Sequence, residues 1–341
     1  RGWNPDPTLS LLRMNPVVSF SEPFVFQPIY QVRVWGGRQL ETQFGRALPD
    51  PDQPYGESWE ISDRAEAESR LVAGPAEFLG KTLGELWRCE DEGIRKAIFG
   101  AGATGTGSFP LLCKILDARE RLSLQVHPPL SEAEALGGEP KTEVWVVAAA
   151  DPNAVLIAGL KPGGTRERLE AALLDGSAEA LVHQMPVQKG DFLFVPSGRL
   201  HAIGAGLVIY EIQQNSDTTY RVFDWNRAGL DGKPRQLHVE ESLRCIDFDD
   251  VEPGIGHSAG HVLVDCPFFR VERHSNSVIS LPESEPAIVT VVSGTVQVEI
   301  NGHRFQEGDF FLMPAAWRGP KRVIATEGEA TLMVTTWPKS A

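Results

Sequence analysis

The sequence lacks any hydrophobic run of about 18 residues, so we expect no membrane-spanning helix. Its first fifteen residues lack both the apolar centre of a signal peptide and the amphipathic, Arg- and Ser-rich pattern of a transit peptide. No CxxC pair occurs, and the four cysteines are far apart in the chain: Cys89, Cys113, Cys245 and Cys266. Such cysteines predict reduced thiols in a reducing compartment, and we therefore expect a cytoplasmic protein.

Positive charge is also scarce. The chain has 32 Lys and Arg residues against 46 Asp and Glu residues, which gives a formal net charge of −14. An acidic surface repels phosphate backbones and anionic lipids, so neither nucleic acid nor a membrane is an expected partner. A phosphorylated small molecule would need a local basic pocket in such a protein.

Turn residues are plentiful, with 33 Gly and 25 Pro spread through the 341 residues between short apolar runs. This pattern predicts an all-β sandwich or barrel of short strands. Expected strands are Val144–Val147, Ala154–Ala158, Phe192–Val195, Leu207–Gln213, Val289–Val292, Val296–Ile300 and Leu332–Thr336. Helical patterns are local, and we expect helices at Leu83–Phe99, Ser131–Leu136, Arg166–Leu174 (after Thr165 as N-cap) and Val239–Arg244.

A weak internal repeat indicates two related halves. Val187–Pro196 reads VQKGDFLFVP and Phe305–Pro314 reads FQEGDFFLMP, each with a Gly-Asp turn before an apolar strand that ends at Pro. With a boundary in the acidic stretch Asp247–Gly256, we predict a mainly β protein of two jelly-roll β-sandwich domains with a few short helices. The expected parts are a tail at 1–18, a metal-binding domain at 19–250 and a degenerate domain at 251–341.

The most informative motif is Gly190–His201, GDFLFVPSGRLH. It matches the pattern G-x5-P-x-G-x2-H, the second motif of the cupin superfamily, at every fixed position. The strand and the turn after it would direct His201 into the barrel. The alternative is a histidine of an ordinary hairpin. In the second half, GDFFLMPAAWRG keeps Gly, Asp and Pro but has Trp317 and no histidine at the ligand position, so we expect no metal there.

Further ligands are expected from two earlier strands. In LQVHPP, Gln125 and His127 are two residues apart and therefore face the same side of a strand. Glu143 follows in KTEVWVV, and with His201 these side chains would form one metal site. Two imidazoles and a carboxylate suit Zn²⁺. LQVHPP alone is weak evidence, because a His before Pro-Pro is more often a turn residue.

Several segments resemble class I mannose-6-phosphate isomerases of the shorter bacterial form, over about Phe20 to Phe248. They are WGGRQL, GESWEIS, FPLLCKILDARERLSLQVHPP, KTEVW and EIQQNSDTTYRVFDWNR, in the family's order. The resemblance implies a cupin fold, one zinc ion per chain and a hexose 6-phosphate as small-molecule partner. It also implies an aldose–ketose isomerase that interconverts mannose 6-phosphate and fructose 6-phosphate through a cis-enediol. The oligomeric state stays open.

The resemblance also implies roles for single residues. Those that match the zinc ligands are Gln125, His127, Glu143 and His201. Arg221 matches the active-site arginine, and Glu211 matches a carboxylate of the catalytic pocket. Ser123 and Lys141 match positions expected to bind the substrate phosphate or line the pocket. Glu211 and Lys141 both remain candidates for the proton carrier.

Three of these residues could instead have a structural role with no part in catalysis. Lys141 can be a surface lysine, Glu211 a surface strand residue, and Arg221 the partner of a structural ion pair with Asp217 or Asp224. One departure from the family pattern is Arg64, which stands where a His often follows the Gly-Glu-Ser-Trp segment.

Two competing functions are an iron-dependent cupin oxygenase and a non-enzymatic sugar-binding bicupin. A Gln ligand and a neighbouring Lys argue against the oxygenase.

Overall fold

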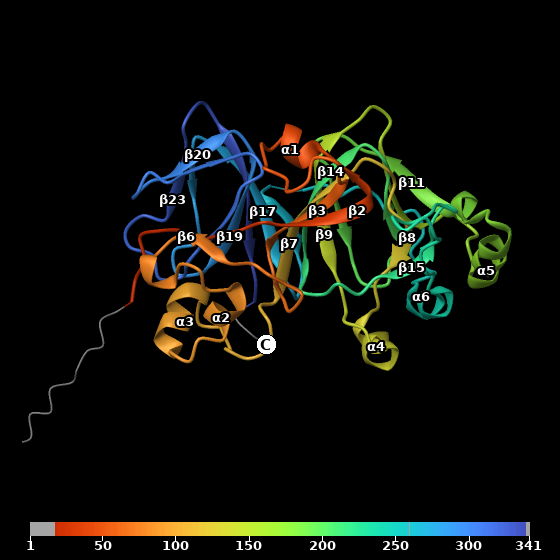
Figure 1. Ribbon diagram of the computed structural model, residues 1–341, viewed down its shortest axis with the longest axis horizontal. Helices are drawn as coiled ribbons and strands as arrows, with labels where there is room; N and C mark the ends of the chain where they lie inside the picture. The colour runs from red at the N-terminus through yellow and green to blue at the C-terminus, as the bar shows by residue number, and fades with distance from the viewer. Residues whose placement is uncertain (1–17, 259, 339–341) are drawn as a thin grey trace, which may run out of the picture.

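A computed structural model describes residues 18–258 and 260–338, and it is mainly β with two β-sandwiches side by side (Figure 1). The first sandwich has a six-stranded sheet in the order β12 (Phe192–Val195), β9 (Glu143–Ala150), β14 (Leu207–Gln214), β7 (Leu111–Ala118), β2 (Ile29–Gly37) and β3 (Tyr55–Ile61). It faces a five-stranded sheet in the order β11 (Val182–Pro186), β10 (Val155–Leu160), β13 (His201–Ile203), β8 (Leu124–Val126) and β15 (Tyr220–Phe223). Part of the space between them is filled by an apolar core that includes Trp35, Trp145 and Ile203.

The second sandwich repeats this plan with fewer strands. One sheet has the order β16 (Val262–Asp265), β17 (Arg270–Asn276), β24 (Ala330–Thr336), β19 (Ala287–Ser293) and β22 (Phe310–Met313). The other has the order β18 (Val278–Ser280), β23 (Arg322–Ala325), β20 (Thr295–Val298) and β21 (Arg304–Gln306). Two small sheets complete the chain: β1 (Val25–Phe26) with β6 (Leu71–Ala73), and β4 (Asp63–Arg64) with β5 (Ala67–Glu68).

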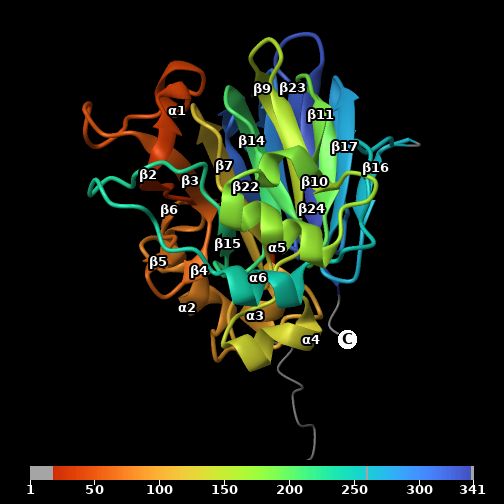
Figure 2. The same cartoon turned by 90° about the vertical axis from the view of Figure 1, so that its right-hand side faces the viewer.

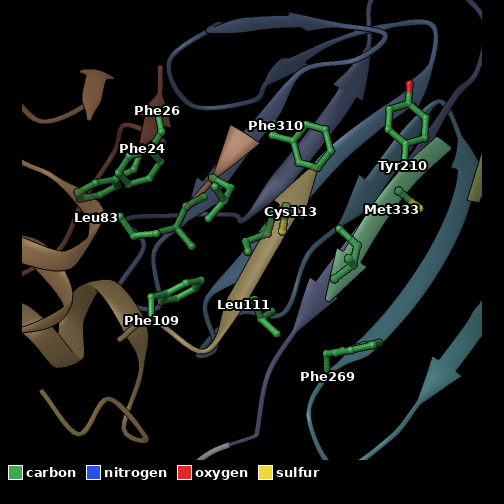
Figure 3. Packing of buried hydrophobic residues seen from close by; sticks show 14 of the residues in the cluster. Phe24, Phe26, Leu83, Phe109, Leu111, Cys113, Tyr210, Phe269, Phe310 and Met333 are labelled. Atoms are coloured by element: carbon green, nitrogen blue, oxygen red, sulfur yellow. The ribbon is translucent and has the colours of Figure 1, made fainter. Parts of the chain in front are cut away.

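The largest core lies where the two sandwiches meet back to back. Figure 3 shows Cys113 of β7 and Tyr210 of β14 close to Met333 of β24. Because side chains alternate along a strand, the intervening residues Lys114 and Glu211 point the other way, into the first sandwich. The shared core therefore fixes the strands that carry polar side chains into that interior.

The helices are short and lie outside the sheets (Figure 2): α1 (Gln39–Thr42), α2 (Leu83–Trp87), α3 (Glu92–Phe99), α4 (Leu130–Ala133), α5 (Arg166–Asp175) and α6 (Val239–Cys245). Three 3-10 turns are η1 (Ala76–Phe78), η2 (Glu134–Leu136) and η3 (Ala178–Leu181). The N-cap at Thr165 is confirmed, since its hydroxyl accepts a hydrogen bond from the Arg168 amide. The single helix expected at Leu83–Phe99 is wrong, because Asp91 caps the Ile94 amide and begins a second helix.

The repeat is visible in the structure. Gly190 and Gly308 both have positive φ, 93° and 90°, and each precedes an edge strand, β12 or β22. The expected tail lies outside the described residues except for its last position. Near the start of the described chain, Phe24 exchanges two backbone hydrogen bonds of 2.8 Å with Leu312, so this segment runs along the second sandwich. The division near residue 250 stays a prediction.

Two predictions from composition concern the described residues. All four cysteines are free thiols, as expected, while the cytoplasmic location stays a prediction. Within residues 18–258 and 260–338, no helix has both the length and the apolar character needed to cross a membrane.

Candidate active site

Two imidazoles and one carboxylate converge inside the first sandwich. His127 follows β8, His201 begins β13 and Glu143 begins β9, and all three side chains are buried. Glu143 Oε1 lies 3.5 Å from His127 Nε2 and 3.6 Å from His201 Nε2. Each residue offers one ligand atom, and these three atoms lie within 4.8 Å of one another, which is close enough to hold one metal ion.

Backbone carbonyls orient both rings. His127 Nδ1 donates to the carbonyl of Thr218 at 2.8 Å, and His201 Nδ1 donates to the carbonyl of Arg199 at 2.8 Å. A carbonyl can only accept, so each ring holds its proton on Nδ1 and presents a bare Nε2 to the cluster. Burial lowers the pKa of both imidazoles, to about 3 for His201 with a further contribution from His127. Both rings are therefore neutral at pH 7, the state that ligates metal.

Gln125 is the fourth neighbour of the cluster. It pairs directly with His201 across β8 and β13, and its side-chain Nε2 lies 3.3 Å from His201 Nε2. Its Oε1 accepts a hydrogen bond of 3.4 Å from the Ser123 hydroxyl. Half a turn of the amide exchanges these two atoms, and then the oxygen faces the cluster.

The cluster fits a divalent cation because its polar atoms are otherwise unpaired. Among the described residues, His127 Nε2 and Glu143 Oε1 are buried without a hydrogen-bond partner. Each such group costs about 1–3 kcal/mol when it stays unpaired. Although burial acts to raise the pKa of Glu143, the charge of Lys141, 3.0 Å away, holds it well below its usual range, so the carboxylate is charged. Two nitrogen donors, a carboxylate and an adjacent amide form a suitable set for Zn²⁺.

A cavity of about 400 Å³ lies beside the cluster. This volume is within the range of small-molecule sites. Its lining includes five of the predicted residues: Ser123, Gln125, Lys141, Glu211 and Arg221. The structure thus brings together the eight residues predicted from the sequence, three as the buried cluster and five around the cavity.

Neither Lys141 nor Glu211 is a surface residue, since they are 4 % and 3 % exposed. Lys141 Nζ lies 3.0 Å from Glu143 and 4.0 Å from Glu211. Glu211 Oε2 accepts a hydrogen bond of 2.9 Å from the indole of Trp145, while Oε1 has no hydrogen-bond partner among the residues that the structure describes. Burial, and then the charge of Glu143, raise the pKa of Glu211. This carboxylate is consequently a stronger base than an exposed one.

Arg221 lies on β15 directly opposite Gln125 of β8. Its Nη1 donates to the carbonyl of Gln236 at 2.7 Å. In the part of the chain that the structure describes, no carboxylate lies within 4.0 Å of its guanidinium, so the alternative ion pair with Asp217 or Asp224 does not form. The Arg221 guanidinium thus faces the cavity with its charge unmatched by any close carboxylate.

The polar segment between Glu211 and Arg221 is buried at its start and lines the cavity farther along. Its first part continues β14 as a buried strand, and Gln213 is fully buried with its amide donating to the carbonyls of Gln214 and Ser216. Only later residues of the segment, Asp217 and Thr219, line the cavity. A glutamine that satisfies local carbonyls can therefore stay in a strand interior.

Sequence reasoning missed a charged group on the opposite wall. Lys114 Nζ lies 3.6 Å from Glu57 Oε2 and 3.6 Å from Glu211 Oε1, and Arg33 Nε contacts Glu57 Oε1 at 2.8 Å. Although burial acts to raise it, the pKa of Glu57 is lowered to about 2 by Lys114 and Arg33. Lys114 had a sequence signal, a lone charge within the apolar run LLCKIL. Arg33 and Glu57 had none, because their placement depends on how β2 and β3 pair with β7.

Arg64, the departure from the family pattern, does not line the cavity. Its Nη1 contacts Glu139 at 2.6 Å and donates to the carbonyl of Asn215 at 3.1 Å, and its Nε contacts Glu66 at 3.2 Å. Arg64 thus links β4 to the segment after β14 from outside the site.

Comparison with known proteins agrees with this geometry. Residues 24–154 match the catalytic domain of phosphomannose isomerase type I. The chain is 35 % identical over 322 residues to the mannose-6-phosphate isomerase of Streptococcus mutans, covering 90 % of this chain and 98 % of that protein. It is 34 % identical over 311 residues to the probable mannose-6-phosphate isomerase GmuF of Bacillus subtilis, covering 86 % and 94 %.

A solved structure shows the same fold. The crystal structure of the mannose 6-phosphate isomerase from Bacillus subtilis superposes with a TM-score of 0.79 at 31 % identity, and the match covers 92 % of this chain and 99 % of that one. With relatives this similar over nearly their whole length, the chain belongs to the type I mannose-6-phosphate isomerase family and has its cupin fold.

Proposed function

We propose that this protein is a zinc-dependent isomerase that interconverts mannose 6-phosphate and fructose 6-phosphate through a cis-enediol. The observation that carries the proposal is the buried cluster of His127, Glu143 and His201 at one end of a cavity with charged walls. The names of the relatives support the choice of substrate. The family resemblance of the site residues agrees with it.

His127, Glu143, His201 and, after rotation of its amide, Gln125 would hold one zinc ion per chain. When bound there, zinc would act as a Lewis acid that polarises the oxygen atoms on the reacting carbons of the sugar. The protein's own part is to keep both imidazoles neutral and Glu143 charged, and to surround the cluster with buried side chains. A buried site strengthens every electrostatic interaction within it.

Glu211 is the better candidate for the proton carrier. Isomerisation moves a proton between C2 and C1, which needs a base near neutral pH. Burial raises the pKa of Glu211, and its Oε1 is free of hydrogen bonds. For Lys141, burial opposes the charged form, but Glu143 and Glu211 together hold its pKa above the ordinary value. A lysine that stays protonated can donate a proton or stabilise charge, but it is a poor base.

Arg221 would stabilise the negative charge that develops on the enediol oxygens. It is opposite Gln125 in strand register, and no carboxylate of residues 18–258 and 260–338 lies close enough to neutralise it. A guanidinium is always charged and offers two parallel donors to such oxygens. Ser123, two residues from Gln125 along the same strand face, lines the cavity and would bind the substrate farther from the metal cluster. The close carboxylates of Lys141 support a place for it at the metal end of the cavity rather than at the phosphate.

The competing functions have less support. An iron-dependent oxygenase would also use a His-rich cluster, but it has no need for Lys114, Lys141 and Arg221 around one cavity. A sugar-binding protein without activity would not need a buried carboxylate with a raised pKa at the cavity wall. The relatives favour an isomerase over both.

The test is turnover by purified protein of measured zinc content. We expect one zinc per chain, production of fructose 6-phosphate from mannose 6-phosphate, loss of activity on chelation and recovery with Zn²⁺. In deuterated water, a cis-enediol route predicts solvent deuterium at C1 of the fructose 6-phosphate. Zinc-loaded protein that fails to turn over mannose 6-phosphate, or full activity in protein shown to be free of metal, contradicts the proposal.

A further inference from the structure

Three arginines lie close together near the cavity, Arg221, Arg227 and Arg235, and two of them, Arg227 and Arg235, share the buried carboxylate of Asp224. Arg235 makes a two-point contact with Asp224, at 2.7 Å from Nε and 2.6 Å from Nη2, and Arg227 Nη2 lies 3.0 Å from the same carboxylate. Among the described residues, the other carboxylate within 4.0 Å of Arg227 is that of the exposed Glu120. Arg221, as described above, has no carboxylate within this distance among the described residues. The cluster therefore carries more positive charge than its carboxylates neutralise.

This surplus charge faces the cavity. Arg221 and Arg235 both line it. Burial, and then the charge of Arg235, lower the pKa of Arg221, as expected for two neighbouring guanidinium groups. Like charges repel, so a fold that holds them together at a cavity wall is suited to an anion. Guanidinium groups bind phosphate through two parallel hydrogen bonds, which makes a phosphate dianion the chemical match.

The segment after β15 that carries Arg227 and Arg235, here called the arginine loop, lies at the end of the cavity away from the metal cluster. His127, Gln125 and Ser123 follow one another along one face of β8, and two residues of a strand span about 6.4–6.8 Å. Beyond Ser123, the loop is tied to the chain by the Trp225 indole, which donates to the Leu122 carbonyl at 2.6 Å. Arg227 Nη1 donates to the carbonyl of Arg121. The loop is thus fixed one step along β8 from Gln125, a separation suited to the reacting carbons and the phosphate of an open-chain hexose 6-phosphate.

We propose that Arg235 recognises the phosphate group of the substrate and sets the preference for phosphorylated over free hexoses. Arg221 and Ser123 lie between this site and the metal cluster, so the sugar chain would extend from one to the other. Lys141 is at the opposite end, paired with Glu143 and Glu211. This inference rests on the proposed function for its substrate, but the anion site can be tested without it.

The experiment compares Arg235→Gln and Arg235→Lys with the wild-type, zinc-loaded chain. For Arg235→Gln we expect a rise of at least about tenfold in KM for mannose 6-phosphate, and an equal rise in the inhibition constant of inorganic phosphate. We expect kcat to change by less than about threefold. Arg235→Lys should recover part of the affinity, because an ammonium supplies the charge but not the planar pair of donors. Asp224 keeps Arg227 as a partner in both variants, which favours folding.

Arg88→Gln is the matched control. Arg88 makes the same two-point contact with a buried aspartate, Asp63, at 2.8 Å and 3.0 Å, and it does not line the cavity. Its loss should lower the melting temperature without changing KM or phosphate inhibition.

Two results would overturn the proposal. One is a KM within twofold of wild type for Arg235→Gln together with unchanged phosphate inhibition. The other is a pattern like that of Arg88→Gln, with lowered stability and no change in phosphate affinity. Should the wild type show no isomerase activity, the proposed function fails, and calorimetry with inorganic phosphate still decides: equal affinity of wild type and Arg235→Gln rejects the anion site.

Discussion

The two sandwiches have similar strand plans and opposite interiors. The first buries charged side chains such as Lys114, Glu143 and Glu211 between its sheets. The core between the sheets of the second is built from apolar side chains, among them Val289, Val291, Val296, Phe311 and Met313. Burying charges is unfavourable unless each is paired, so the first interior gives up packing free energy for its chemistry. The jelly roll itself requires neither kind of interior.

The repeated motif shows where the halves diverge. After matching turns and strands, Pro196 is followed by Gly198, whose φ of 95° turns the chain toward His201. In the second half, the residues after Pro314 instead pack against α3: the amides of Ala315 and Ala316 donate to the carbonyls of Ile98 and Ala97. One copy of the turn therefore directs His201 into the buried His–Glu–His cluster, and the other packs against a helix.

Removing a ligand from the first interior should have the largest effect. For His127→Ala or His201→Ala we expect zinc content to fall from one per chain to near zero, and isomerase activity to fall to background with it, because one of the two imidazole ligands is lost. His303→Ala is the control and should retain zinc, since His303 belongs to the second sandwich, where it stacks on Phe305. The measurements are metal analysis and turnover on the same samples. A fully zinc-loaded, active His201→Ala protein would contradict the assignment of His201 as a zinc ligand.

Opening a cavity in the second interior should lower the stability of the fold and leave zinc binding unchanged. Phe311 is fully buried and stacks on Phe305 with ring centroids 3.8 Å apart. Phe311→Ala should lower the free energy of unfolding by about 3–5 kcal/mol, as measured by denaturant titration. Zinc content and KM of the folded fraction should stay at wild-type values. If Phe311→Ala loses zinc while its stability is unchanged, the two interiors are not independent in the way proposed here.

The difference between the interiors was partly readable from the sequence. Gln125, His127, Glu143 and His201 occur in short motifs whose spacing fixes the direction of each side chain, so their convergence needed only the pairing of neighbouring strands. The charged wall formed by Arg33 and Glu57 depends on β3 lying beside β7, a long-range pairing that local patterns do not specify. Whether Arg221 pairs with a carboxylate also depends on long-range packing, so the sequence left that question open.

Arg221→Ala tests the charge that the first interior leaves unpaired. If its main contact forms in the transition state, kcat should fall by about 10²–10³-fold, on the order of 2.7–4 kcal/mol, with little change in KM. Stability should hardly change, because only one hydrogen bond, to Gln236, is lost. Turnover and melting temperature measured on the same protein decide the matter. A normal kcat with a lowered melting temperature would remove Arg221 from the catalytic residues.

The smallest expected effect is on the pH dependence of stability, through the buried carboxylate of Glu57. Glu57 is charged in the folded protein because Lys114 and Arg33 overcome the burial that favours its neutral form, and its pKa falls from 4.5 to about 2. A carboxyl group with a lowered folded-state pKa stabilises the fold above its unfolded pKa, and this stabilisation disappears as the pH falls toward the folded value. The contribution of Glu57, about 3 kcal/mol near pH 7, should therefore decline from about pH 4.5 downward.

Glu57→Gln should accordingly be less stable than wild type at pH 7, and the difference should shrink between pH 5 and pH 3. Denaturant unfolding at several pH values measures this. Glu299→Gln in the second sandwich is the control: its pair with Arg322, 2.8 Å apart, is about one third exposed. Such surface pairs contribute less than about 1 kcal/mol, so its stability difference should stay small at every pH. A difference between wild type and Glu57→Gln that does not vary with pH would mean that Glu57 is not held charged by its neighbours, and the contrast between the two interiors would then rest on the metal cluster alone.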